Sequence, residues 1–131
     1  MFGRQLCRWV DVAYKEAQKG DHKQKMGAVI FNKSKFISCG HNYTCRSISS
    51  HLPKFRHWNT SLHAEVIAVI NAKTNLNGCS ILVVRVNNQG ELRFAKPCVK
   101  CMEYIKYVGI RKVYYSLSHY PYIEMIKIEV Q

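Results

Sequence analysis

Two short motifs in this sequence carry side chains suited to metal chemistry. His63 and Glu65 stand two residues apart, and Cys98 and Cys101 follow Pro97 in a C-x-x-C pattern. One imidazole and two thiolates supply three zinc ligands, whereas a structural zinc site has four protein ligands and a catalytic one has three and a water. The ligand count therefore predicts a catalytic zinc site formed by His63, Cys98 and Cys101.

Glu65 is the carboxylate that this ligand count leaves over. At the start of a helix, a side chain two residues after His63 can still face a site that lies beyond the helix end. Zinc lowers the pKa of a bound water to about 7, and Glu65 would then act as the general base and acid. The alternative is a zinc knuckle, in which a fourth His or Cys closes the site and Glu65 is a solvated helix residue.

Two predicted helices must position these motifs. The first runs from about Leu62 to Lys73, where an apolar run with helical spacing follows the candidate N-cap Ser61. The second runs from about Cys98 to Tyr107, and Pro97 suits its first turn. A spacing of three puts both cysteines on one helix face. If both N-termini point at the metal, their dipoles favour the thiolates.

The rest of the chain alternates predicted helices and strands. Leu6, Val10, Ala13 and Ala17 predict a helix from about Arg4 to Lys19. The predicted strands are Gly27 to Phe31 and Phe36 to Cys39, which form a hairpin, then Ile81 to Val86 with a hairpin extension at Glu91 to Phe94, and Val113 to Ser116.

The last strand is predicted to be antiparallel to the one before it. Only Leu117 to Tyr122 separates Ser116 from the alternating Ile126, Ile128 and Val130. So few residues cannot form the helical crossover that parallel strands need. The alternative is a C-terminal helix, because Ile123, Ile126 and Val130 also fit a helical stripe.

The combined pattern H-x-E followed by P-C-x-x-C is the signature of zinc-dependent nucleobase deaminases. The chain resembles the cytidine and deoxycytidylate deaminase superfamily over about its whole length. Beyond the zinc motifs, Met26 to Ile30 resembles the first core strand of that family. Gly40-His41-Asn42 is similar to the loop whose Asn binds the substrate sugar, and Gly109 to Tyr115 to the turn and strand after the second zinc helix.

The resemblance implies a three-layer α/β/α fold around a five-stranded mixed sheet, formed as a single zinc-dependent deaminase domain over residues 1–131. It implies Glu65 as the catalytic residue, and Asn42, Ala64 and Pro97 as substrate-binding residues. Relatives are commonly oligomeric, so a homo-oligomer is expected, with Trp9, Trp58 or the tyrosines as candidate interface residues.

Composition narrows the classes of partner. The 131 residues carry 20 Lys and Arg against 8 Asp and Glu, a formal net charge of +12, which favours phosphate-bearing partners. No segment has the apolar length of a signal peptide or membrane span, so we expect a cytoplasmic protein without a membrane partner. The six cysteines are then more typical of zinc ligands and buried thiols than of a disulfide framework.

The segment from His41 to about Thr60 is long, basic and aromatic, and it includes Lys54, Phe55, Arg56 and Trp58. Because it joins Asn42 to the zinc helix, we expect it to border the pocket; the alternative is a surface insertion. A second zinc site drawn from Cys39, His41, Cys45, His51 and His57 is a further hypothesis.

The leading functional hypothesis is hydrolytic deamination of the cytosine of a nucleoside or nucleotide, giving uracil and ammonia. The alternative is a polynucleotide-editing deaminase that acts on cytosine or adenine in single-stranded DNA or RNA, with aromatic and basic residues holding the strand. A purine base as substrate and an inert zinc-stabilised binding module are the remaining hypotheses.

Overall fold

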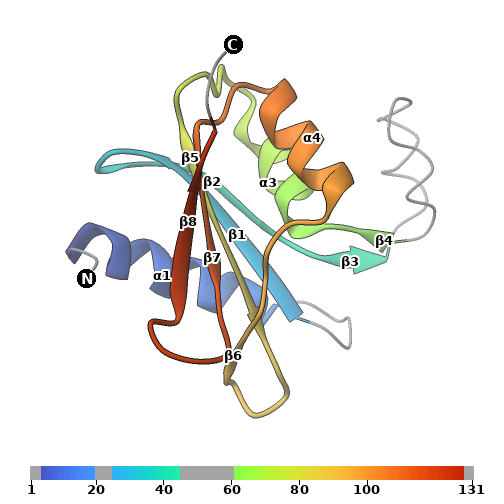
Figure 1. The fold of residues 1–131 in the computed structure, drawn as a ribbon. Helices are drawn as coiled ribbons and strands as arrows, with labels where there is room; N and C mark the ends of the chain where they lie inside the picture. Colours follow the sequence, from blue (N-terminus) through green and yellow to red (C-terminus); the bar gives the residue numbers. More distant parts are fainter. Residues whose placement is uncertain (1–3, 20–24, 45–60, 129–131) are drawn as a thin grey trace.

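The computed structural model describes residues 4–19, 25–44 and 61–128 (Figure 1). In chain order the elements are α1 (Arg4–Ala17), β1 (Lys25–Asn32), β2 (Lys35–His41), β3 (Tyr43–Thr44), β4 (Ser61–Leu62), α3 (Ala64–Ala72), β5 (Ser80–Val86), β6 (Leu92–Arg93), α4 (Val99–Tyr107), β7 (Lys112–Ser116) and β8 (Ile123–Lys127). The predicted helices and strands all appear, with boundaries shifted by a few residues.

The main sheet has the strand order β2-β1-β5-β7-β8, and the short β6 pairs with β5 at its end. Only the β5–β7 pair is parallel, and α4 lies in the connection between them. The sheet is therefore mixed as predicted, although it has six strands because the hairpin extension at β6 joins it.

The last strand, β8, runs antiparallel to β7, as the short connection before it predicts. Val113 pairs with Ile126 and Ser116 with Ile123. The alternative of a C-terminal helix over this segment is wrong, because Ile123 to Lys127 is extended and paired along its whole length.

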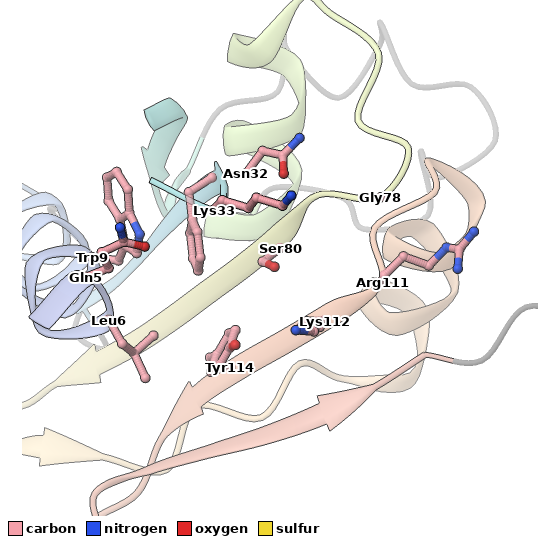
Figure 2. Close-up of a pocket in the computed structure, with 11 residues that line it drawn as sticks. Gln5, Leu6, Trp9, Asn32, Lys33, Gly78, Ser80, Arg111, Lys112 and Tyr114 are labelled. Atoms are coloured by element: carbon pink, nitrogen blue, oxygen red, sulfur yellow. The ribbon is translucent and has the colours of Figure 1, made fainter. Parts of the chain in front are cut away.

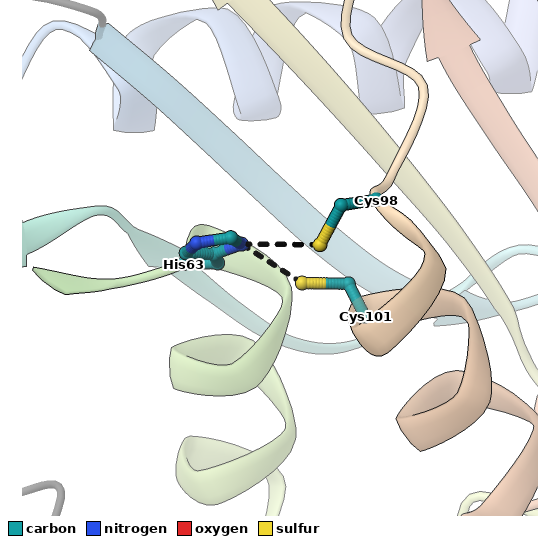
Figure 3. A group of neighbouring side chains, drawn as sticks. All are labelled: His63, Cys98 and Cys101. Carbon is teal, nitrogen blue, oxygen red and sulfur yellow. Dashed lines mark hydrogen bonds between the residues drawn. The ribbon is translucent and has the colours of Figure 1, made fainter. Parts of the chain in front are cut away.

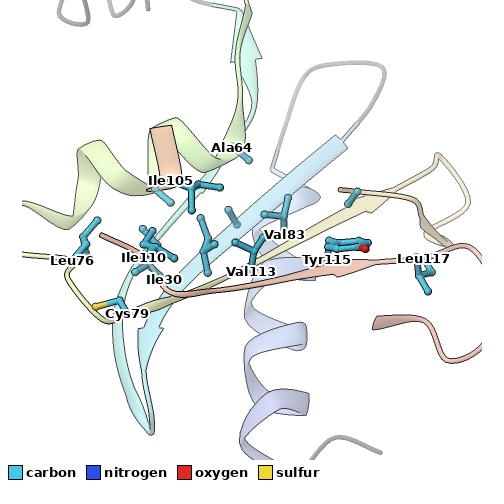
Figure 4. Packing of buried hydrophobic residues seen from close by; sticks show 14 residues of the cluster. Ile30, Ala64, Leu76, Cys79, Val83, Ile105, Ile110, Val113, Tyr115 and Leu117 are labelled. Carbon is cyan, nitrogen blue, oxygen red and sulfur yellow. The ribbon is translucent and has the colours of Figure 1, made fainter. Parts of the chain in front are cut away.

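Helices cover both faces of the sheet, which gives the predicted three layers. Figure 1 shows α1 on one side and α3 with α4 on the other. In β5, Leu82 and Val84 pack in the core beneath α1, whereas Ile81 and Val83 pack in the core beneath α3 and α4 (Figure 4). A strand that is buried on both faces needs apolar residues at successive positions, which explains the run from Ile81 to Val84.

Two glycines let the helices approach the sheet closely. A Cβ atom on Gly27 of β1 would lie 2.2 Å from the carbonyl oxygen of Ala13 in α1. A Cβ atom on Gly40 of β2 would lie 2.6 Å from the backbone nitrogen of Ala68 in α3. Each glycine thus fixes a helix backbone directly against a strand, on opposite faces of the β1–β2 hairpin.

Both helices of the zinc motifs begin later than predicted. The N-cap of α3 is His63 and not Ser61, because Ser61 and Leu62 pair as β4 with β3. The N-cap of α4 is Cys98, so Pro97 precedes the helix and does not lie in its first turn. Extended pairing up to Leu62 delays the first helical turn to Ala64.

The base of the segment between Asn42 and His63 is a two-stranded ribbon. Tyr43 pairs with Leu62 and Thr44 with Ser61. Residues 45–60, with Lys54, Phe55, Arg56, Trp58 and the candidate ligands Cys45, His51 and His57, lie outside the described residues. In the described part of the chain, no helix has both the length and the hydropathy to span a membrane.

Candidate functional site

The ends of α3 and α4 that meet at one place are both N-termini. His63, the N-cap of α3, and Cys98, the N-cap of α4, both have extended backbone angles, and neither side chain caps its own helix. Cys101 follows in the first turn of α4. Figure 3 shows the imidazole of His63 and the two thiols pointing toward one another across the gap between the helices. The structure thus brings together all three predicted ligands.

The distances between the donor atoms match a small metal site. Nδ1 of His63 lies 2.9 Å from Sγ of Cys101 and 3.8 Å from Sγ of Cys98. All three ligand atoms lie within 4.8 Å of one another. Tetrahedral zinc, with bonds of about 2.0–2.3 Å, places neighbouring N and S donors about 3.6 Å apart. The cluster is therefore close to the size of a zinc coordination sphere, slightly contracted at Cys101.

The chemistry of the donors also fits zinc. Burial, the Glu65 carboxylate and the neighbouring Cys98 all raise the pKa of the Cys101 thiol well above its ordinary value. A buried thiolate at this position needs a cation beside it, and a thiolate is the form that binds a metal. Two thiolates and one neutral imidazole would balance the charge of a divalent ion, so these residues fit the predicted metal.

Glu65 lies inside the protein, beside this cluster. It is 1% exposed, and its Oε1 has no hydrogen-bond partner in the described part of the chain. Burial raises the pKa of its carboxyl to about 7, although hydrogen bonds from the backbone and from Cys101 act in the opposite direction. A buried carboxyl oxygen without a partner costs about 1–3 kcal/mol, which packing alone does not repay.

These observations oppose the zinc-knuckle alternative. That alternative requires Glu65 to be solvated and a fourth His or Cys to complete the ligand set. Glu65 is buried, and no fourth such residue joins His63, Cys98 and Cys101 within the described ranges. A perturbed carboxyl next to a ligand cluster is typical of an active site.

Asn42 is held at the edge of this site by the backbone of β1. It is 5% exposed; its Oδ1 accepts a hydrogen bond from the N–H of Met26 at 2.9 Å, and its own N–H donates to the carbonyl of Met26 at 3.2 Å. It directly precedes β3, just as His63 directly follows β4. Continuing the β3–β4 register therefore sets Asn42 opposite His63.

The two other predicted substrate-binding residues adjoin the ligands along the chain. Ala64 follows His63 and is fully buried in the core beneath α3 and α4. Pro97 precedes Cys98 and is also buried. Their contact with substrate stays a prediction that rests on the resemblance.

The second zinc site is not supported by the residues that the structure describes. Cys39 and His41 instead contact the Glu16 carboxylate of α1, at 3.4 and 2.7 Å. Burial and the charge of Glu16 raise the pKa of Cys39 to about 11. The other three candidates, Cys45, His51 and His57, lie outside the described residues.

The contacts of Glu16 with Cys39 and His41 were not predicted from the sequence, although the position of Glu16 in its helix indicates burial. Glu16 falls on the apolar stripe of α1 with Leu6, Ala13 and Ala17, and it is only 8% exposed. A carboxylate on the buried face of a helix needs hydrogen-bond donors from the sheet. Trp9 belongs to the same face and is 1% exposed, so its prediction as an interface residue is wrong for this chain.

Solved structures that share this fold include deaminases. The apo dCMP deaminase of the cyanophage S-TIM5 superposes with a TM-score of 0.66 at 19% identity, covering 89% of this chain and 86% of that one. The cytidine deaminase of Burkholderia pseudomallei superposes with a TM-score of 0.62 at 15% identity, covering 92% of this chain and 91% of that one. No curated protein matches the sequence at a significant level.

A bifunctional protein shares the fold over part of its length. The diaminohydroxyphosphoribosylaminopyrimidine deaminase/5-amino-6-(5-phosphoribosylamino)uracil reductase of Thermotoga maritima gives a TM-score of 0.55 at 20% identity, covering 83% of this chain and 28% of that one. At these identities the likeness shows a common fold and leaves the substrate open. A family model, described as the cytidine and deoxycytidylate deaminase zinc-binding region, matches residues 4–117, and the chain belongs to this family.

Proposed function

We propose that this protein is a zinc-dependent deaminase that converts the cytosine of a cytidine or deoxycytidine nucleoside or nucleotide to uracil and releases ammonia. The observation that carries the proposal is the buried Glu65, whose unpartnered carboxyl oxygen lies beside a cluster of three zinc ligands. Family membership supports a deaminase. The choice of cytosine is supported by the dCMP and cytidine deaminases that share the fold, one of them solved with dCMP and dUMP.

In this proposal His63, Cys98 and Cys101 hold the metal at the N-termini of α3 and α4. Zinc, when bound, supplies a Lewis acid that activates water for attack on the amine-bearing carbon. Glu65 takes a proton from the attacking water, donates a proton to the ring nitrogen and later delivers one to the leaving amine. One water is consumed and one ammonia is released, so the reaction needs no further reactant.

Asn42 is proposed to bind the substrate sugar from the edge of the site. Its Oδ1 accepts the N–H of Met26, which fixes the plane of the amide beside His63. Ala64 and Pro97 would form the walls next to the metal ligands. The net charge of +12 supports a substrate that carries phosphate.

A panel of substrates tests this proposal. We expect ammonia release from cytidine, deoxycytidine, CMP or dCMP, and about one zinc per chain by elemental analysis. Adenosine, guanine, single-stranded DNA and tRNA complete the panel. Activity on a purine alone would support the assignment as a deaminase and reject cytosine as the substrate base. No ammonia from any substrate by zinc-loaded protein would reject the enzyme and favour a binding module.

The second candidate is a polynucleotide-editing deaminase, which the surplus of Lys and Arg favours. It predicts binding of single-stranded nucleic acid that weakens steeply with salt, with a log–log slope of about −0.7 per phosphate contacted. A mononucleotide offers one phosphate group and gives a shallow dependence. The test is a double variant, Lys54→Ala with Arg56→Ala. A steep salt dependence of single-strand binding that this double variant abolishes would make editing the leading function.

A further inference from the structure

A pocket of about 400 Å³ lies on the α1 face of the sheet, where β1 ends and where β5 and β7 begin. Figure 2 shows Leu6 and Trp9 of α1 on one side of it and Lys112 and Tyr114 of β7 on the other. Its volume falls in the range of small-molecule sites. The candidate active site lies at the opposite end of β1, beside Met26, and six residues of strand from Met26 to Asn32 span about 20 Å.

The charged residues of this pocket are all basic. Lys33 of the β1–β2 turn and Arg111 and Lys112 at the start of β7 line it, and no Asp or Glu is among the described residues that do. In the described part of the chain no carboxylate forms an ion pair with any of the three. Gln5, Asn32 and Ser80 add side chains that donate hydrogen bonds.

The sheet register sets one further cation next to Lys112, outside the described lining of the pocket. Lys112 lies directly opposite Lys127 of β8, so both side chains stand on one face of the sheet. Like charges directly opposite on paired strands repel each other and destabilise the pair. Ser80 of β5 lies opposite Lys112 on the other side, so a hydroxyl and two ammonium groups form one row across three strands.

One wall of the pocket also holds an unsatisfied donor. Trp9 is 1% exposed and stacks on Phe31 with ring centroids 5.0 Å apart. Its Nε1 can only donate, and it has no acceptor in the described part of the chain. The described lining therefore combines cations with N–H and O–H donors and includes no carboxylate, which is the composition of a phosphate-binding site.

We propose that this pocket between α1 and the starts of β5 and β7 binds the phosphate groups of a ligand other than the substrate, with Lys33, Arg111 and Lys112 as its cations. The phosphate belongs either to a small metabolite or to the backbone of a nucleic acid strand. A ligand here contacts the far face and the far end of the sheet from Glu65. The proposal does not depend on the proposed function.

An amide-resolved NMR titration of the zinc-loaded protein tests this site. The probes are inorganic phosphate and an oligothymidylate, which has no exocyclic amine and so cannot be deaminated. We expect saturable shifts at the amides of Ser80, Lys112 and their neighbours with at least one probe. Shifts that saturate with phosphate indicate a small phosphate-bearing ligand. Shifts that saturate at lower concentrations of the oligothymidylate than of phosphate, with a steep salt dependence, indicate a nucleic acid strand.

Two variants make the titration decisive. Lys112→Gln should weaken binding of the active probe about tenfold, because it removes a charge-assisted hydrogen bond. Lys106→Gln, an equally exposed lysine of α4 on the other face, should leave binding unchanged. The proposed site would be wrong if both variants bind the probe with equal affinity. It would also be wrong if neither probe gives saturable shifts, or if the shifts are confined to the N-termini of α3 and α4.

Discussion

Nδ1 of His41 lies 2.7 Å from Oε2 of Glu16, and this contact joins the end of β2 to α1 one residue before Asn42. Oε1 of the same carboxylate accepts from the Cys39 thiol and pairs with Lys19 at 3.1 Å. Glu16 thus receives donors from two positions of β2 and from Lys19, which lies in the turn that follows α1. The close contact of Gly27 with Ala13 fixes the same helix to β1. The helix α1 therefore holds both β2, which directly precedes Asn42, and β1, whose Met26 hydrogen-bonds to Asn42.

Replacing Glu16 should therefore destabilise the fold. In Glu16→Gln one oxygen becomes an NH₂ group that faces a donor, and we expect a loss of about 1.5–3 kcal/mol in the free energy of unfolding. The control is Lys19→Gln, which removes only the solvent-screened ion pair at an exposed lysine and should cost much less than Glu16→Gln. Urea unfolding measures both, and equal losses would show that the buried contacts contribute nothing beyond the surface pair.

The contribution of Glu16 should also depend on pH. Burial alone would raise the pKa of this carboxyl, but hydrogen bonds from His41, Lys19 and Cys39 lower it below its ordinary 4.5. A lowered pKa gives stability that is complete above about pH 4.5 and is lost as the pH falls through the folded value. The difference in unfolding free energy between the native protein and Glu16→Gln should shrink below pH 4.5. A difference that stays constant from pH 7 to pH 3 would contradict this assignment.

Metal removal should change the reactivity of one exposed thiol. Cys98 and Cys7 are both exposed, but only Cys98 belongs to the ligand cluster. We expect iodoacetamide to modify Cys7 with or without zinc, and Cys98 only after chelation, because a bound thiolate is not available for alkylation. Peptide mass spectrometry distinguishes the two sites. Rapid labelling of Cys98 in protein that retains its zinc would remove it from the ligand set.

Two variants of Asn42 distinguish its hydrogen bond to Met26 from its proposed contact with the substrate. Asn42→Ala removes the acceptor for the Met26 N–H and should weaken the fold as well as any ligand contact. Asn42→Asp keeps that acceptor and loses only the Nδ2 donors. We expect Asn42→Asp to keep the zinc content while kcat/KM falls about 10- to 100-fold, mainly through KM. An unchanged kcat/KM would make Asn42 a structural turn residue.

The sequence predicted the His63, Cys98 and Cys101 cluster and most of the fold because those features are local. His63, Glu65, Cys98 and Cys101 stand at short spacings on segments with strong helical periodicity, and the short connection after Ser116 determines the direction of β8. Pairings between distant segments could not be predicted in this way. The β3–β4 ribbon joins residues that are 17 or more positions apart. It moved the N-cap of α3 from Ser61 to His63, so the helix begins at Ala64 and not at Leu62.

Long-range contacts also explain the two misassigned groups. Cys39 and His41 have the side chains of zinc ligands, and only the packing of α1 on β2 shows that they contact Glu16. Trp9 has the composition of an interface residue, and only its stacking on Phe31 shows that it is buried. The basic pocket depends on the register of Ser80 with Lys112, which local periodicity does not set.

The central claim is that Glu65 moves protons at a zinc site held by His63, Cys98 and Cys101. The most direct measurement is ammonia release from cytidine and dCMP by the native protein and by Glu65→Gln at equal, verified zinc content. An amide can neither take nor deliver the proton, so we predict a loss in kcat of at least about 100- to 10,000-fold with the fold unchanged. A Glu65→Gln protein that binds one zinc per chain and turns over at a near-native rate would contradict the account.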